Sequence, residues 1–357
     1  MQRVDRYAPR TGWDRQVFRV SFTGDSFLPD GNFPSPDVGL GVFSDAPFVE
    51  LRGFPEHTPE VTPAQLGADQ GVIVRGSKIT RATLAQAEHL LAVVRFGVGY
   101  DNVDVPACTG AGVVAAITPG AVDRCVSEAT LCWMLALSHN LMGKDRLVRE
   151  ARWGDPLRFQ GCEIGGRTLG IIGLGRIGRA LAQLCEGLGM NPPIGFDPFV
   201  TDGGPVRMVG LDELMSSADF VSIHCPLTPQ TSNLIGAREL ALMKPDAYLI
   251  NVARGGIVDE EALYQALKHR RIAGAGIDCF IGEPLTAPPR FAELDNVILA
   301  PHGIAITREH GQRLGTMSCQ AMLDLARGKR PVGVLNPEVF DRADFQAKWA
   351  RLIQDLK

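Results

Sequence analysis

The feature that most constrains the fold of this chain is a glycine pattern between a short apolar run and a helical stretch. The segment Thr168–Gly178 has the sequence TLGIIGLGRIG. A strand, a tight glycine turn and a helix start follow one another here, an order typical of a dinucleotide-binding βαβ unit. Gly173 permits the turn, Gly175 lets the backbone approach a pyrophosphate, and Gly178 lets helix and strand pack closely.

The residues after this turn support the same interpretation. A helix over Arg179–Leu188 would offer free N–H groups and a positive dipole end to phosphates. A second apolar strand, Pro193–Phe196, ends at Asp197, 19 residues after Gly178. An acidic residue near that distance accepts hydrogen bonds from ribose hydroxyls and repels a 2′-phosphate. We therefore predict NAD as the cofactor, against the alternative of a glycine turn without a ligand.

Short apolar runs alternate with helical patterns along almost the whole chain. Continuous apolar strands in such an alternation predict parallel sheets covered on both faces. Ten strands predict an α/β protein with two doubly wound parallel-sheet domains. Residues 23–60, rich in Pro, Gly and Asp, are expected to form an irregular surface segment. The predicted strands are Phe18–Phe22, Gly71–Arg75, Leu91–Val94, Val113–Ala116, Thr168–Gly173, Pro193–Phe196, Asp219–His224, Ala247–Asn251, Ala273–Ile277 and Asn296–Ala300.

Two long helices are predicted where the domains join. The first spans Val122–Glu150 and the second spans Thr307–Arg327. If both cross between the domains, residues 119–308 form a central Rossmann NAD-binding domain. Residues 1–118 and 309–357 then form a discontinuous, flavodoxin-like substrate-binding domain.

Composition argues against several classes of protein. The chain has 357 residues and a formal net charge of −4, so its composition does not indicate the basic surface that nucleic-acid binding usually needs. Its longest apolar run, Leu131–Leu137, is far shorter than the ~20 residues that cross a bilayer. Eight cysteines without C-x-x-C or metal-finger spacing predict no metal site and a reducing compartment. No apolar stretch follows the N-terminal charges, so we expect a cytoplasmic protein without a signal peptide.

Three loops after predicted strands carry polar residues suited to catalysis. Arg254 lies in a glycine turn, and Asp278 and Glu283 follow a buried strand. His302 follows a third strand. Taken alone, each has a plain structural alternative: a surface arginine on a loop, two solvated turn acids, and a capping or satisfied histidine. In open α/β sheets, however, ligands bind beyond the carboxyl ends of strands, where all three loops are expected, so the shared placement favours an active site.

These residue types suit hydride transfer at C2 of a small D-2-hydroxy acid or its 2-keto form. When hydride leaves C2, a proton must leave the hydroxyl, and His302 is the predicted acid/base. Glu283 is predicted to fix the tautomer of that histidine and to favour the imidazolium. Arg254 presents a planar fork that matches a carboxylate, so we predict that it binds the substrate and polarises the keto oxygen.

The order of motifs along the chain resembles the D-isomer-specific 2-hydroxyacid dehydrogenase family. The resemblance covers most of residues 71–338 and implies a usually dimeric enzyme with its active site in the interdomain cleft. It implies the same roles for Arg254, Glu283 and His302. The matching stretches are Phe96–Asp104, Thr118–Gly120, Gly170–Gly178, His224–Pro229, Asn251–Asp259, Gly276–Pro284, Pro301–His302 and Asn336–Glu338.

The resemblance also implies further binding residues. The backbone N–H groups of Gly97, Val98 and Gly99 are implied to meet the substrate carboxylate, and Asp278 to help hold the nicotinamide carboxamide. His224 lies on the implied cofactor side, with a core histidine at a strand end as the alternative. The implied cofactor residues are Gly173, Gly175, Arg176, Ile177, Gly178, Asp197, His224, Pro226, Thr231, Ala253, Arg254, Asp278, His302 and Gly303.

Some positions depart from the family pattern. Ile117 and Val122 stand where the family commonly has Asn, and the residues after His302 also differ. Because these positions touch the cleft wall and hinge, phosphoglycerate dehydrogenase and glyoxylate/hydroxypyruvate reductase activities both stay open. Formate dehydrogenases resemble the chain less, since they carry an amide where it has Glu283. Residues 1–65 match no pattern.

Three basic residues lie near predicted strand ends of the first domain: Arg75, Lys78 and Arg95. In phosphoglycerate dehydrogenases, basic residues of these two segments contact the substrate phosphate, so the resemblance implies a substrate with a second anionic group. The alternative is a solvated rim at Arg75 and Lys78 and an ion pair at Arg95.

A protein of another class could share this scaffold. An NAD-sensing binding protein, such as a transcriptional corepressor, needs the cofactor site but no turnover. Consumption of NADH with a panel of 2-keto acids separates that alternative from an enzyme.

Overall fold

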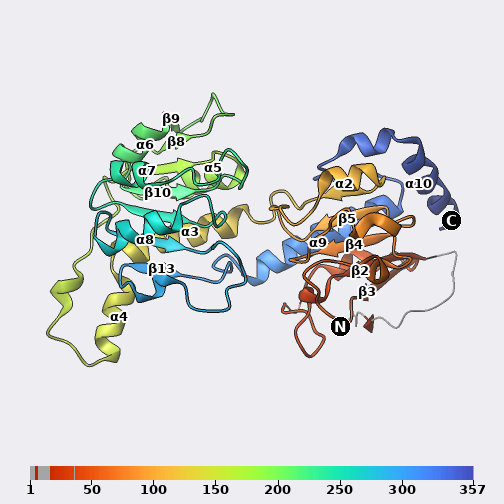
Figure 1. Ribbon diagram of the computed structural model, residues 1–357, viewed down its shortest axis with the longest axis horizontal. Coiled ribbons are helices and arrows are strands. Elements are labelled where there is room, and N and C mark those ends of the chain that lie inside the picture. The colour runs from red at the N-terminus through yellow and green to blue at the C-terminus, as the bar shows by residue number, and fades with distance from the viewer. Residues whose placement is uncertain (1–4, 7–16, 36, 357) are drawn as a thin grey trace. The chain divides into compact units, whose positions relative to one another are not determined.

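The computed structural model describes residues 5–6, 17–35 and 37–356 (Figure 1). The chain forms two compact units. Unit 1 comprises Met1–Val122 and Thr307–Lys357, and unit 2 comprises Asp123–Ile306. These bounds lie within four residues of the domain bounds expected from the sequence, and the function of each unit stays a prediction.

Unit 2 is built on a sheet of seven parallel strands in the order β13-β12-β11-β10-β7-β8-β9. The first strand along the chain, β7, lies inside the sheet, with the next two on one side and the later four on the other. This is the strand order of a Rossmann fold. The strands are β7 (Leu169–Ile172), β8 (Ile194–Phe196), β9 (Arg207–Met208), β10 (Phe220–Ile223), β11 (Tyr248–Asn251), β12 (Gly274–Ile277) and β13 (Val297–Leu299).

Helices cover both faces of this sheet because successive strand residues point to opposite sides. Ile171 packs with side chains of α3 and α5, and the next residue, Ile172, packs with side chains of α6, α7 and α8. The helices of the unit are α3 (Asp123–Ser138), α4 (Leu141–Arg149), α5 (Arg176–Cys185), α6 (Leu211–Ser217), α7 (Ala237–Leu242) and α8 (Glu260–Lys268).

Unit 1 holds a second parallel sheet, of six strands in the order β1-β3-β2-β4-β5-β6. Apart from the two-residue β1, this is the flavodoxin-like order. Ile73 packs with α9 and α10 on one face, while Val72 and Val74 pack with α1 and α2 on the other. The elements are β1 (Asp5–Arg6), β2 (Phe18–Phe22), β3 (Val49–Gly53), β4 (Gly71–Val74), β5 (Ala92–Arg95), β6 (Val114–Ala116), α1 (Pro63–Leu66), α2 (Val105–Gly110), α9 (Arg308–Ala326) and α10 (Ala343–Asp355).

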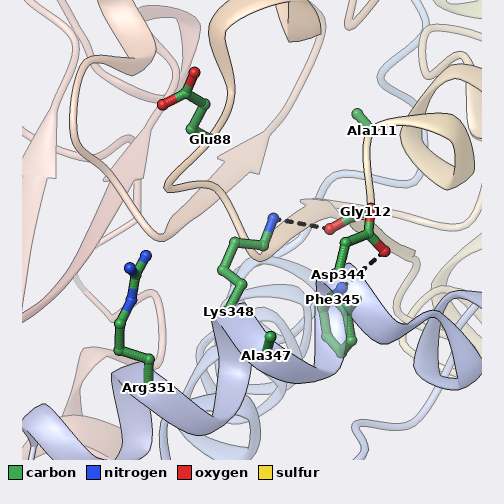
Figure 2. A pocket seen from close by; sticks show the side chains of 8 residues that line it. All are labelled: Glu88, Ala111, Gly112, Asp344, Phe345, Ala347, Lys348 and Arg351. Carbon is green, nitrogen blue, oxygen red and sulfur yellow. Dashed lines mark hydrogen bonds between the residues drawn. The ribbon is translucent and has the colours of Figure 1, made fainter.

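The C-terminal helix α10 is tied to the amino ends of two strands (Figure 2). Lys348 Nζ donates to the carbonyl of Gly112 at 2.9 Å, just before β6, as Figure 2 shows. It also donates to the carbonyl of Leu90 at 2.6 Å, just before β5. Burial lowers the pKa of this lysine to about 8. The helix and these loops line a cavity of about 500 Å³. No predicted site residue lines it, because such residues follow the carboxyl ends of strands.

The predicted fold class, two doubly wound parallel sheets, is confirmed. All ten predicted strands are present, each end within one residue of its predicted position. The helix expected over Val122–Glu150 is wrong as a single element, since α3 ends at Ser138 and Asn140 takes a left-handed φ of 51° before α4. The helix that follows the glycine turn begins at Arg176, three residues earlier than predicted.

The segment 23–60 is not wholly irregular, because it contains β3, which pairs with β2 and β1 inside the sheet. The strand is difficult to detect in the sequence because Glu50 and Arg52 interrupt the apolar pattern. In the fold Glu50 accepts hydrogen bonds from Arg19 Nε at 3.3 Å and Arg52 Nη2 at 2.5 Å, so the charges are paired. Within the described ranges, no helix has both the length and the apolar character needed to cross a membrane.

Candidate active site

The glycine turn after β7 has the geometry that its sequence predicts. Gly173 has a φ of +91°, and a Cβ there would lie 2.5 Å from the backbone nitrogen of Cys225. A Cβ at Gly178 would lie 2.4 Å from the carbonyl oxygen of Gly173. At Gly175, which caps α5, a Cβ would have no neighbour within 4 Å. The turn thus leaves open space at a helix N-terminus, where phosphate groups bind well; contact with a pyrophosphate stays a prediction.

Asp197 follows β8 beside this turn. One carboxylate oxygen accepts from the backbone N–H of Leu174 at 2.9 Å, and the other accepts from Phe199 at 2.9 Å. Each carboxylate oxygen can accept a further hydrogen bond, so the group retains capacity for ribose hydroxyls. Arg176 of the turn donates from Nε to Asp123 at 2.8 Å, which directs its guanidinium to the start of α3.

His224 turns back onto its own strand. Its Nε2 lies 2.8 Å from the hydroxyl of Ser222, and burial lowers the pKa of the imidazole to about 4. The ring is therefore neutral at pH 7. Because His224 is partly exposed and not a core residue, its contact with a cofactor stays a prediction. The loop after it is held internally, because Thr231 donates to the carbonyl of Pro226 at 2.6 Å.

Arg254 follows β11 in a turn that Asn251 organises. The Asn251 side chain donates to the Arg254 carbonyl at 2.8 Å and accepts from the Ala253 N–H at 3.1 Å. A Cβ at Gly255 would lie 2.1 Å from the carbonyl carbon of Phe280, so the turn packs directly on the loop after β12. The supporting role of Asn251 was missed at the sequence level, although its place at a strand end beside Arg254 is a usable signal.

Asp278, buried after β12, holds the next turn. Its Oδ1 accepts from the N–H groups of Gly303 at 2.8 Å and Ile304 at 3.2 Å, and its carbonyl accepts from His302 N–H at 2.7 Å. Burial raises the pKa of the Asp278 carboxyl, and the two N–H groups oppose that change. These bonds fix the backbone of His302, whose φ is 50°; contact of Asp278 with a carboxamide stays a prediction.

Glu283 and His302 form a direct pair. His302 Nδ1 lies 2.6 Å from Glu283 Oε2, and Glu283 Oε1 accepts from the Phe280 N–H at 2.5 Å. Burial raises the pKa of Glu283, but these hydrogen bonds and the charges of His302 and Arg254 outweigh it, so the pKa is lowered overall. An ionised carboxylate on Nδ1 leaves Nε2 for proton transfer.

The structure thus brings together the predicted groups at the carboxyl ends of three adjacent strands. Arg254 follows β11, Asp278 and Glu283 follow β12, and His302 follows β13. The same sheet edge carries the glycine turn after β7.

The predicted substrate residues of unit 1 lie after β4 and β5. Arg75 donates from Nη1 to the carbonyl of Asp25 at 3.3 Å, and Lys78 is exposed. Arg95 donates to the Phe96 carbonyl and lies against Gly97. Among the described residues, the backbone N–H groups of Val98 and Gly99 have no acceptor. Such N–H groups suit a carboxylate, as the resemblance implies.

Two basic residues of α9 were missed at the sequence level. Burial lowers the pKa of His310 to about 4, assisted by the positive charges of Arg313, Arg75 and Arg95. These four side chains are therefore near enough to interact, and they form a basic cluster in unit 1. No local motif marks His310 or Arg313, because their helix follows β5 by more than 200 residues.

Comparison with known proteins identifies the class of this chain. Residues 131–303 match the family described as D-isomer specific 2-hydroxyacid dehydrogenase, NAD binding domain. A D-3-phosphoglycerate dehydrogenase from Methanocaldococcus jannaschii is 40% identical over 75% of this chain and 52% of that protein. A glyoxylate reductase from Thermococcus litoralis is 36% identical over 85% of this chain and 95% of that protein.

Solved structures agree with these matches. An NADPH-dependent glyoxylate/hydroxypyruvate reductase from Sinorhizobium meliloti, in complex with NADP and malonate, superposes with a TM-score of 0.76. It is 26% identical, and the match covers 90% of this chain and 97% of that chain.

The chain belongs to the D-isomer specific 2-hydroxyacid dehydrogenase family, which confirms the resemblance inferred from its motifs. It is thereby placed among NAD(P)-dependent oxidoreductases. The chain spans about half the length of the Methanocaldococcus relative and nearly the whole length of the Thermococcus relative.

Proposed function

We propose that this protein transfers a hydride between NAD(H) and C2 of a small D-2-hydroxy acid or its 2-keto form. The observation that carries the proposal is the 2.6 Å pair between Glu283 and His302, at the same sheet edge as the open glycine turn. The positive charge of Arg254 helps to lower the pKa of Glu283. An acid/base, its carboxylate partner and a carboxylate-binding arginine are the groups that this reaction needs.

Each residue has one task in the proposed reduction. Arg254 binds the substrate carboxylate and polarises the keto oxygen with its planar fork. His302, as the imidazolium, gives the proton on Nε2 to the oxygen of C2. Glu283 keeps the other ring nitrogen protonated and stabilises the positive charge. Bound NADH supplies the hydride to C2, and NAD accepts it in the reverse direction.

We expect NAD to be preferred to NADP by at least about 10-fold in kcat/KM. The carboxylate of Asp197 would meet a 2′-phosphate with like charge, and two unit charges 4 Å apart near a protein surface repel by about 4 kcal/mol. In Asp197→Asn the preference should shrink, mainly through the KM for NADP. Asp202→Asn, in the following exposed loop, is the matched control. Equal kcat/KM values in the wild type would contradict the prediction, and the NADP-bound relative makes this comparison necessary.

We propose further that the substrate carries a second anionic group, such as the phosphate of 3-phosphohydroxypyruvate. The proposal is supported by the positive charges of Arg75, Arg95 and Arg313, which surround a neutral His310 in the basic cluster, and by the relatives named D-3-phosphoglycerate dehydrogenase. The second candidate is a simple 2-keto acid, favoured by the relative named glyoxylate reductase that this chain matches over most of its length.

A substrate panel separates these candidates. The kcat/KM values for 3-phosphohydroxypyruvate and 2-ketoglutarate are compared with those for hydroxypyruvate, glyoxylate and pyruvate, at low and moderate salt. Preference for the doubly charged acids should weaken with salt and should collapse in Arg75→Ala but not in Arg81→Ala, an exposed neighbour. If simple acids react best and Arg75→Ala changes nothing, the substrate is a simple 2-keto acid. If no acid consumes NADH, the NAD-sensing alternative replaces the enzyme.

We propose that the protein is a cytoplasmic homodimer that associates through the surface of α4 and the loop after it. Large apolar side chains are exposed there, with Trp153 at 78% and Leu157 at 85%, and α4 adds Leu141, Met142 and Val148. Exposed apolar patches of this kind mark association surfaces. Light scattering should give twice the chain mass, and the double variant Trp153→Ser, Leu157→Ser should shift it toward the monomer. A monomeric wild type would contradict the proposal; Phe199→Ser, exposed elsewhere, is the control.

A further inference from the structure

A thiol lies beside the acid/base pair. The Sγ atom of Cys279, a carboxylate oxygen of Glu283 and a ring nitrogen of His302 all lie within 4.8 Å of one another. Among the residues that the structure describes, this is the one group of three such side chains that meets this spacing. Cys279 immediately follows Asp278 in the loop after β12, so its place next to the pair comes from the fold and not from a recognisable cysteine motif.

The three donor atoms match the ligand preferences of Zn²⁺. Zinc takes thiolate sulfur at about 2.3 Å and imidazole nitrogen or carboxylate oxygen at about 2.0–2.2 Å, in a tetrahedron completed by water at open sites. Neighbouring ligand atoms of such a tetrahedron are about 3.3–3.6 Å apart. Cys279 Sγ lies within 4.8 Å of both partner atoms, so it is at most about 1.5 Å beyond this spacing, and the 2.6 Å contact between Glu283 and His302 has to widen. A thiolate ligand disfavours Mg²⁺ and Ca²⁺, which take oxygen ligands.

The backbone around these ligands is held by hydrogen bonds that metal binding leaves intact. Asp278 holds the turn of His302, and the Ile281 N–H donates to Glu260 Oε1 at 2.7 Å in the loop of Cys279. Cys279 is 2% exposed as a residue, and its thiol donates to the Ala253 carbonyl at 3.4 Å. The His302 side chain is 41% exposed, so an ion would arrive from the solvent side and meet the thiol last.

We propose that Cys279, Glu283 and His302 form a zinc site whose occupation switches off the acid/base pair. On binding, the thiol releases its proton to solvent, and His302 binds as the neutral imidazole, with any proton of the imidazolium released to solvent and the remaining one on the ring nitrogen that does not bind. Sγ, one carboxylate oxygen and the unprotonated ring nitrogen then take up a single ion. Two anionic ligands balance the charge of the ion. The imidazole and carboxylate that bind the metal are those that form the hydrogen bond needed for proton transfer, so bound zinc and catalysis exclude each other. The inhibition rests on the proposed function; the binding does not.

Cobalt(II) tests the binding without turnover. Titration of the full-length protein with Co²⁺ should give one equivalent of a four-coordinate spectrum with a thiolate-to-cobalt charge-transfer band, which Zn²⁺ then removes. Cys279→Ala, and Cys279→Ser as a variant of the same size, should lose that band. Their Zn²⁺ affinity should fall by at least about 10- to 100-fold, the loss that even an outer-shell change at a metal site causes. Cys132→Ala, an exposed thiol on α3, should behave as the wild type.

Inhibition is measured separately as NADH consumption at increasing Zn²⁺. Wild type and Cys132→Ala should be inhibited alike, while Cys279→Ala should stay active to at least about 10-fold higher Zn²⁺. No charge-transfer band in the wild type, or one that persists in Cys279→Ala, overturns the site. Equal inhibition of wild type and Cys279→Ala overturns the switch. If the band appears but no keto acid is reduced, the zinc site stands and the proposed function fails.

Discussion

Replacing His302 with alanine is expected to lower kcat by about 100-fold or more, the usual contribution of general acid–base catalysis. Without the imidazole, no group in the described site can give a proton to the oxygen of C2 from the position next to Glu283. The measurement is kcat for keto-acid reduction at saturating NADH. His269→Ala, which removes an exposed histidine after α8, is the control and should retain wild-type turnover.

The partner of His302 gives a second, more specific readout of the same prediction. In Glu283→Gln the 2.6 Å contact can persist as a neutral hydrogen bond, but the charge that stabilises the imidazolium is gone. Reduction needs the imidazolium, so the activity of Glu283→Gln should fall off at a lower pH than that of the wild type. The loss of kcat in Glu283→Gln should be smaller than in His302→Ala. An unchanged or higher midpoint in the pH–rate profile would show that the carboxylate only positions the ring.

Replacing Arg254 with lysine is expected to lower kcat/KM by about 100-fold, or about 2.7 kcal/mol of transition-state stabilisation. The substitution keeps the positive charge but loses the planar fork that binds a carboxylate through two parallel hydrogen bonds. It also loses the Nη1 contact with the Ala253 carbonyl at 2.8 Å, which orients the guanidinium in its turn. The measurement is kcat/KM for the best keto acid, with Arg271→Lys as the exposed control.

A second variant makes this prediction sharper. Added guanidinium should partly restore Arg254→Ala, because the side chain it replaces is the binding group itself. Arg271→Ala should keep wild-type activity, so added guanidinium should not change it. Near-wild-type activity of Arg254→Lys would mean that the substrate carboxylate is held elsewhere, and the backbone N–H groups of Val98 and Gly99 are the alternative that the family resemblance implies.

His302 and Arg254 act on different parts of the proposed reaction. His302 variants change a chemical step and should leave the KM for the keto acid largely unchanged. Arg254 variants change binding as well as polarisation and should alter both constants. Parallel measurement of kcat and KM therefore separates proton transfer from substrate binding, even if both residues prove essential.

Most of the fold was predictable because it depends on local patterns. Most strands of the two sheets are buried on both faces, so each of these is a largely apolar run that stands out against the helices around it. Three strands were missed, the two-residue β1 and β9 and the five-residue β3. In β3 the charge of Glu50 is neutralised by a residue far away in sequence, Arg19 of β2. When the charges of a strand are paired by a distant residue, the local sequence of that strand is as polar as that of a loop.

The sequence by itself determined the class of site: a glycine turn before a helix, and polar residues directly after apolar strands. These signals are local, because turn geometry and strand ends are set by a few neighbouring residues. Only the tertiary structure decided which of these residues touch. The contact between Glu283 and His302, the meeting of Cys279 with that pair, and the approach of His310 to Arg75 and Arg95 join residues on separate elements. Such contacts depend on strand order and loop packing, which no local pattern encodes.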